Sequence, residues 1–199
     1  MIGILNYGSG NIKSLSNALE NIEEEYKIVN NKNHFKEISK LIIPGVGSYS
    51  DTMLKIKKKN FLDEIRNFAE KKCVLGICVG MQILSDNGHE EKHTQGLKII
   101  KGSVKKIYEN QQISHVGWNN LVIQKKSILF KNLHDKCDFY FVHAYHFCCE
   151  DKKNISAQCI FNKKNLVAVV ESKNVFGVQF HPEKSHKNGL KVLKNFCKI

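Results

Sequence analysis

The stretch Cys73-Val74-Leu75-Gly76-Ile77-Cys78-Val79-Gly80-Met81-Gln82-Ile83-Leu84 decides the fold of this chain. Its pattern predicts a short buried strand, a tight turn at Cys78 and an amphipathic helix. The spacing Gly-x-Cys-x-Gly is that of a nucleophile elbow, where a sharp turn lifts one side chain above the sheet. The turn also places the cysteine at a helix N-terminus, which favours the thiolate. A buried structural cysteine between two turn glycines would have the same spacing, so other motifs must decide.

Length and composition indicate one globular domain covering residues 1–199. The chain is 42% hydrophobic and 25% charged, which is ordinary for a globular protein. Its longest uncharged apolar stretch, 73–85, is too short to cross a bilayer, and the N-terminus lacks the features of a signal peptide. Seven cysteines without a Cys-x-x-Cys pair argue against a disulfide framework and a zinc site, and favour a reducing cytoplasm.

The formal net charge of +12 raises the question of nucleic-acid binding. Nearly all of the positive charge is lysine, spread along the whole chain, and Arg66 is the only arginine. A protein that reads bases usually needs arginine forks and aromatic residues among its basic ones. The sequence therefore favours solvated lysine faces over a nucleic-acid interface. Attraction to a phosphorylated small molecule or to an acidic protein surface stays open.

The first half of the chain alternates short apolar runs with segments of helical periodicity. Strands are expected at 2–5, 26–29 and 41–43, and helices over 12–24, 50–58 and 61–70. The turn 6–11 contains Gly8-x-Gly10, but Lys13 occupies the place of the third glycine in a dinucleotide-binding fingerprint. A plain strand-to-helix turn is therefore the preferred interpretation.

From Gly96 onward, apolar and polar residues alternate, which indicates antiparallel strands. These strands are expected within 97–108, 113–123, 138–148, 155–161, 166–170 and 175–180, with turns at Asn110 and Asn119-Asn120 and a closing helix over 190–196. No linker separates the two halves. We therefore expect a single α/β domain with a central, mostly parallel sheet, flanking helices and additional antiparallel strands in the second half.

Two more motifs place reactive groups at strand ends. Pro44-Gly45-Val46-Gly47 follows an expected strand, and its glycines would let N–H groups point into a cleft as an oxyanion hole requires. A glycine-rich turn alone would explain that motif as well. His181-Pro182-Glu183 also ends a strand, and could supply the base that a thiolate needs and the carboxylate that orients it. We expect Cys78, His181 and Glu183 together at the C-terminal edge of the sheet.

These motifs resemble those of a known family, the class I (triad) glutamine amidotransferases. The similarity lies in Gly76–Gln82, which matches the nucleophile motif, and Gln179–Glu183, which matches the His–Glu motif. Within the family, the glutaminase subunits of imidazole glycerol phosphate synthases are most similar. Pro44–Gly47, His115-Val116-Gly117-Trp118-Asn119 and Tyr140-Phe141-Val142-His143-Ala144-Tyr145 carry that likeness. The resemblance covers essentially the whole chain and implies the class I glutamine amidotransferase fold.

The resemblance implies hydrolysis of glutamine to glutamate and ammonia, with no cofactor and no metal. Cys78 would be the nucleophile, His181 the general acid and base, and Glu183 the residue that orients His181. Backbone groups of Val46, Gly47 and Val79 would form the oxyanion hole. The implied substrate-binding residues are Gln82, Glu90, His143, Ala144 and Tyr145.

The resemblance also implies a partner. Ammonia would pass to a (β/α)₈-barrel cyclase in a heterodimer, which forms imidazole glycerol phosphate and aminoimidazole carboxamide ribonucleotide in histidine biosynthesis. Trp118, Asn119, Tyr140 and Lys184 match positions near that interface. Ser114 and Val79 depart from the family pattern, so a paralogous subunit that supplies ammonia for amidation of a surface sugar is the alternative. Two alternatives from other classes, a cysteine hydrolase of related fold and a basic binding module, would not need Pro-Gly-Val-Gly together with His-Pro-Glu.

Overall fold

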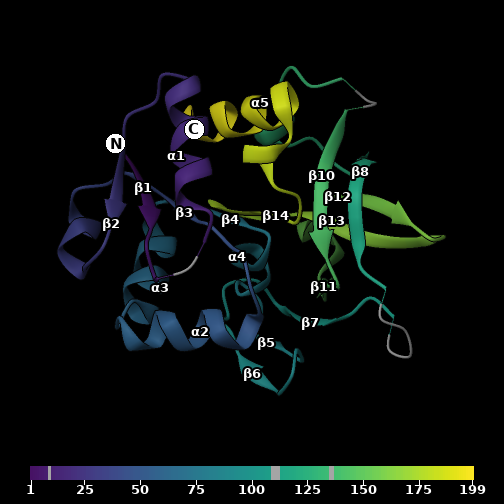
Figure 1. The fold of residues 1–199 in the computed structure, drawn as a ribbon, viewed down its shortest axis with the longest axis horizontal. Coiled ribbons are helices and arrows are strands. Elements are labelled where there is room, and N and C mark those ends of the chain that lie inside the picture. The colour runs from purple at the N-terminus through teal and green to yellow at the C-terminus, as the bar shows by residue number, and fades with distance from the viewer. Residues whose placement is uncertain (9, 109–112, 135–136) are drawn as a thin grey trace.

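The structure is a computed structural model that describes residues 1–8, 10–108, 113–134 and 137–199. Its described part is built on an eight-stranded sheet with the strand order β2-β1-β3-β4-β14-β13-β12-β9 (Figure 1). The strands are β1 (Ile2–Leu5), β2 (Tyr26–Val29), β3 (Lys40–Ile43), β4 (Cys73–Ile77), β9 (Val122–Ile123), β12 (Ile155–Phe161), β13 (Lys164–Ser172) and β14 (Val175–Val178). The first five strands in this order, from β2 to β14, are parallel to one another. Each of β13, β12 and β9 then pairs antiparallel with the strand before it in the order. The predicted fold class is confirmed.

Helices cover both faces of this sheet (Figure 1). The longer helices pack an apolar stripe against it. The α-helices are α1 (Ile12–Asn21), α2 (Tyr49–Lys58), α3 (Leu62–Lys71), α4 (Val79–Gln82) and α5 (His186–Cys197). Helices α1 and α5 contribute to one buried apolar cluster, and α2 and α3 contribute to the other. Short 3₁₀ turns complete the set: η1 (Lys32–Lys36), η2 (Ile128–Phe130), η3 (Lys152–Asn154) and η4 (Pro182–Lys184).

Two smaller sheets stand beside the central one (Figure 1). Strands β8 (His115–Asn120) and β10 (Asp138–His143) pair antiparallel. The other sheet has the order β11-β7-β5-β6 and consists of β5 (Asn87–Gly88), β6 (Thr94–Gln95), β7 (Gly102–Lys106) and β11 (Tyr145–Cys149). The amide of His181, just beyond β14, donates to the carbonyl of Tyr140 in β10 at 2.9 Å. That bond fixes the β8–β10 pair next to the C-terminal edge of the central sheet.

Several predicted element boundaries are wrong for identifiable reasons. Helix α1 ends at Asn21 rather than at residue 24, because Glu23 adopts a left-handed φ of 60°. Helix α4 is a single turn whose four residues are all buried, so it is not amphipathic. Residues 97–101 form no strand, since the amides of residues 97–100 bond instead to carbonyls of residues 83–85.

The second half also departs from the predicted turns. Asn119 and Asn120 lie inside β8, where they pair with Phe139 and Asp138, so the turn expected there is wrong. The expected strand over 138–148 is divided at Ala144 into β10 and β11, which belong to different sheets. The turn expected at Asn110 lies outside the described residues. Within the described part of the chain, no helix has the length and apolar character of a membrane span.

Candidate active site

Cys78 occupies a strained turn between β4 and α4. Its φ of 54° and ψ of −115° form a combination that non-glycine residues rarely adopt. Close packing requires glycine on both sides of it. A Cβ at Gly80 would overlap the carbonyl oxygen of Ile43 and lie 3.0 Å from its carbonyl carbon, and a Cβ at Gly76 would lie 2.7 Å from the amide nitrogen of Met81. These features are those of a nucleophile elbow.

Three adjacent parallel strands bring the predicted motifs to one edge. Strand β4 lies between β3 and β14, with Gly76 opposite Ile43 and Ile77 opposite Val178. Pro44 directly follows β3, Cys78 directly follows β4, and His181 lies three residues beyond β14. Because the strands are parallel and in register, the three segments meet above the C-terminal edge of the sheet.

His181 and Glu183 form a buried pair. The Nδ1 atom of His181 lies 2.8 Å from Oε1 of Glu183, and the two side chains are 1% and 3% exposed. The Oγ of Ser185 donates to the His181 carbonyl at 2.6 Å and accepts the amide of Tyr140 at 3.0 Å. The side-chain amide of Asn11 donates to Oε1 of Glu183 at 3.4 Å. The imidazole is therefore held from both its backbone and its ring.

Electrostatics favour the charged form of His181. Burial disfavours the imidazolium, but hydrogen bonds to Cys78 and Glu183 outweigh it and raise the pKa of His181 to about 10. The ring is therefore protonated near neutral pH. A proton-carrying imidazole beside a cysteine sulfur can stabilise a thiolate and later protonate a leaving group.

Cys78 and His181 open onto a cavity of about 240 Å³. It is lined by Val46, Gly47, Cys78, Val79, Gln82, Glu90, Val142, His143, Tyr145 and His181. The structure thus brings together most of the residues proposed from the sequence. Ala144 is not among the lining residues, and its carbonyl accepts the amide of Ile107 at 2.9 Å.

Glu90 contributes a carboxyl group to the cavity wall. Burial raises the pKa of this carboxyl group, while the amide of Tyr49 donates to its Oε2 at 2.7 Å and acts in the opposite direction. Tyr49 is the first residue of α2. The carboxyl group is therefore positioned by a helix N-terminus, where a negative charge is favoured.

His143 lines the cavity as a neutral ring with both nitrogens engaged. Its Nδ1 lies 2.8 Å from the Tyr145 carbonyl, which can only accept, so Nδ1 carries the proton. Its Nε2 must then accept from Nδ1 of His115 at 3.1 Å, and Nε2 of His115 accepts from the Asn119 side-chain amide at 3.1 Å. Burial lowers the pKa of His143 to about 3 and that of His115 to about 4.

Two residues near the sulfur had no role in the sequence-based prediction. The amide Nε2 of Gln179 lies 3.7 Å from Sγ of Cys78, and the carbonyl oxygen of Val142 lies 4.0 Å from it. One signal could have identified Gln179. It precedes His181 by two residues, and residues two apart in extended chain point to the same side.

The residues expected at a partner interface do not all lie together. Trp118 pairs with Tyr140 across β8 and β10, and Nζ of Lys184 lies 5.9 Å from the centre of the Tyr140 ring. Trp118 is 46% exposed and stacks on His186, with ring centroids 5.0 Å apart. Asn119 follows Trp118 in the strand and points the other way, because its amide bonds to His115 and to a β12 carbonyl.

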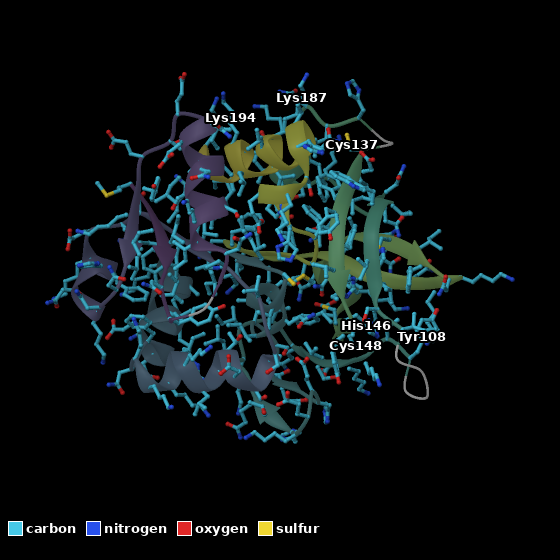
Figure 2. All side chains as sticks on the ribbon, viewed as in Figure 1. Tyr108, Cys137, His146, Cys148, Lys187 and Lys194 are labelled. Atoms are coloured by element: carbon cyan, nitrogen blue, oxygen red, sulfur yellow. The ribbon has the colours of Figure 1, made fainter. Side chains whose placement is uncertain are left out.

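A second cysteine–histidine contact lies outside the cavity. On β11, Sγ of Cys148 is 3.7 Å from Nε2 of His146 (Figure 2). Burial raises the pKa of the Cys148 thiol and lowers the pKa of His146, so this pair stays neutral. His181 differs in that hydrogen bonds to Cys78 and Glu183 raise its pKa. In the described part of the chain, no three or more His, Cys, Asp or Glu residues are grouped as metal ligands would be.

Comparisons with known proteins agree with this geometry. The model of the family described as glutamine amidotransferase class-I matches residues 3–199. The chain is 39% identical to imidazole glycerol phosphate synthase subunit HisH of Sulfurimonas denitrificans, covering 100% of this chain and 98% of that protein. It is 38% identical to subunit HisH 1 of Campylobacter jejuni, with 100% of both chains covered.

A solved structure described as a glutamine amidotransferase supports the fold. It superposes with a TM-score of 0.78 at 20% identity, covering 99% of this chain and 97% of that one. The chain therefore belongs to the class I glutamine amidotransferase family and, within it, is related over its whole length to the HisH subunits of imidazole glycerol phosphate synthase.

Proposed function

We propose that this chain is the glutaminase subunit of an imidazole glycerol phosphate synthase. In this role it hydrolyses glutamine and passes the ammonia to a (β/α)₈-barrel cyclase, with which it forms a heterodimer. The observation that carries the hydrolysis is the strained Cys78 facing the His181–Glu183 pair in one cavity. The observation that carries the pathway is the full-length similarity to HisH subunits.

The proposed reaction uses the three residues in sequence. The Cys78 thiolate attacks the carboxamide carbon of glutamine, and His181 gives its proton to the departing ammonia as the carbon–nitrogen bond breaks. A thioester remains. Water, deprotonated by His181, attacks the thioester and releases glutamate. Glu183 keeps the imidazole in the required orientation throughout, through its 2.8 Å bond to Nδ1.

The proposed oxyanion hole lies beside the sulfur. Val79 is the first residue of α4, a position whose N–H has no partner within the helix. Val46 and Gly47 line the same cavity from the neighbouring strand end. We propose that their backbone N–H groups stabilise the tetrahedral intermediate. The resemblance to this family also implies that the isolated chain is nearly inactive until its partner binds.

The surface proposed for the cyclase adjoins the cavity. Trp118, Tyr140 and Lys184 are neighbours there, and Val142, two residues along β10 from Tyr140, lines the cavity itself. Val116 and Val142 face each other across the two strands and are 58% and 38% exposed. This exposed apolar strip is of the kind that protein partners bury.

The proposal places the protein in the cytoplasm, and all seven of its cysteines are free thiols.

A substitution at the nucleophile tests the hydrolysis. Cys78→Ser is expected to abolish glutamate release while the protein keeps its circular dichroism spectrum and melting temperature. Cys148→Ser is the matched control, because that cysteine lies beside His146 outside the cavity. Retained turnover in Cys78→Ser would overturn the mechanism.

The pathway is tested with the partner. Glutamate release is measured for the chain mixed with the cyclase subunit from its own organism, with and without the phosphoribosyl-linked aminoimidazole carboxamide acceptor. Strong stimulation by the acceptor is the expected result. If a demonstrably folded pair shows no stimulation, the assignment to histidine biosynthesis is wrong, even if glutamine hydrolysis is retained.

A further inference from the structure

The amide of Gln179 is directed at the sulfur of Cys78. Its side chain is fully buried, and its Nε2 lies 3.7 Å from Sγ. We propose that Gln179 is a further catalytic residue, which donates an amide hydrogen bond to the Cys78 thiolate, and that Gln82 is the positioning residue that fixes the direction of this amide. This inference rests on the proposed function, because it assigns a task within that reaction.

Hydrogen bonding leaves the Gln179 amide one orientation. The carbonyl oxygen of Tyr145 can only accept, and it lies 2.9 Å from the amide of Gln82, so that atom must be the nitrogen Nε2. The same Nε2 lies 3.0 Å from the Gln179 amide, which must present its oxygen there. The nitrogen of Gln179 then faces the sulfur. A flipped Gln179 would turn its N–H group toward the N–H group of Gln82.

The chain of hydrogen bonds is anchored at its far end. The Tyr145 carbonyl also accepts from Nδ1 of His143, whose ring is held by His115. His115 lies between the rings of Phe141 and Phe161, with ring centroids 4.6 and 4.4 Å away. Since these histidines are neutral and packed, the Tyr145 carbonyl has little freedom to move away from Gln82.

The same arrangement limits what Gln82 can offer a ligand in the cavity. Both hydrogens of its amide nitrogen are used, one on the Tyr145 carbonyl and one on Gln179. A bound ligand could reach only the oxygen of Gln82. Both N–H groups of Gln82 are therefore engaged, one of them by the residue that faces the nucleophile.

Besides His181, the sulfur has two hydrogen-bond partners, and these suit different protonation states. The Val142 carbonyl, 4.0 Å from Sγ, can accept a thiol proton. The Gln179 amide can only donate to the sulfur, and hydrogen bonds to a charged acceptor are stronger than those to a neutral one. Gln179 therefore favours the thiolate over the thiol.

The ionisable groups around Cys78 must be held constant in a test. His181, His143, Glu90 and Tyr145 line the cavity with it, Glu183 is bonded to His181, and Tyr7 interacts electrostatically with Cys78. Gln179 is uncharged. Replacing it with methionine, which is similar in length, therefore removes a hydrogen-bond donor without adding or removing a charge.

The experiment measures the rate of Cys78 alkylation by iodoacetamide across pH, in the full chain with its cyclase partner. In Gln179→Met, we expect the half-maximal pH to rise by about one unit. The kcat for glutamine hydrolysis should fall roughly tenfold, with KM little changed. Gln82→Met should shift the profile in the same direction by less. Gln124→Met makes the same change at an exposed site and should leave the profile unchanged.

An unchanged alkylation profile in folded Gln179→Met would overturn the proposal. If that variant does not fold, Gln179→Asn keeps a buried amide but is one methylene too short to reach the sulfur, and an unchanged profile there has the same meaning. Failure of the proposed function gives a different result. The alkylation profiles of the wild type and Gln179→Met would then still differ as predicted, but the wild type would release no glutamate from glutamine.

Discussion

Gly80→Ala tests whether close packing at the elbow holds the site together. Helix propensity alone predicts that this change in α4 stabilises the protein by about 1 kcal/mol. The structure predicts the opposite sign. The added Cβ would overlap the carbonyl oxygen of Ile43 and lie 3.0 Å from its carbon, where atoms in contact prefer about 3.5 Å or more. Ile43 ends a strand that is paired on both sides, by β1 and β4, so its backbone atoms have little room to yield.

Overpacking of this kind costs about 1–3 kcal/mol, and a collision with backbone belongs at the upper end of that range. Subtracting the gain in propensity leaves a net loss of about 2 kcal/mol, or a melting temperature about 4–8 °C lower for a chain of this size. Strand β3 leads directly into Pro44 and the proposed oxyanion segment. A displacement of about 1 Å there would lower kcat for glutamine hydrolysis by about 100-fold.

Thermal unfolding and glutamate release with the cyclase partner measure the two effects of Gly80→Ala. Gly8→Ala is the matched control, because its Cβ would have no atom within 4 Å, although its φ of 92° makes any side chain there strained. That control should lose some stability but keep the hydrolysis activity. If Gly80→Ala is as stable as the wild type and equally active, the packing argument for the elbow is refuted.

Three further predictions concern stability. Because hydrogen bonds to Cys78 and Glu183 raise the pKa of His181 above 6.5, the stabilisation from its protonation is complete below pH 6.5 and is lost as the pH rises through the raised pKa. Urea unfolding should show this loss of stability at high pH in the wild type but not in His181→Gln. Tyr7→Phe removes a buried 2.8 Å hydrogen bond to the Pro44 carbonyl and should cost about 1–3 kcal/mol by the same assay, whereas no loss would contradict the anchoring of that loop. Asn174→Ala removes a side-chain amide that bonds two carbonyls at the end of α3, and should lower the melting temperature by about 2–6 °C, a shift that calorimetry would detect.

The edge of the parallel sheet was predictable because strand-end chemistry is local. The runs before Pro44, Cys78 and His181 are apolar and short, and parallel strands deliver their C-terminal ends to one side. Sequence could therefore place these three motifs together without knowing the strand order. The order β3-β4-β14 then made them neighbours, although β14 comes last among the strands along the chain.

The smaller sheets could not be predicted in the same way. Alternation of apolar and polar residues is identical whichever sheet a strand joins, so the division at Ala144 between β10 and β11 left no signal. Asn119 and Asn120 resemble a turn because asparagine favours turns, but Asn119 in β8 bonds to His115 and a carbonyl of a neighbouring strand. Tertiary hydrogen bonds decided the outcome there.

Two of the nine histidines show which part of the chemistry of the site can be predicted from the sequence. His143 and His181 line the same cavity, and both are buried. Burial lowers the pKa of His143 to about 3, although the Tyr145 carbonyl that accepts from its Nδ1 acts in the opposite direction. It also disfavours charge on His181, yet the pKa there rises to about 10, since Glu183 and Cys78 supply partners for an imidazolium. Part of the environment of His181 is visible in the sequence, because Glu183 follows it by two residues. The hydrogen-bond network that keeps His143 neutral involves His115 in another strand, so only the fold reveals it.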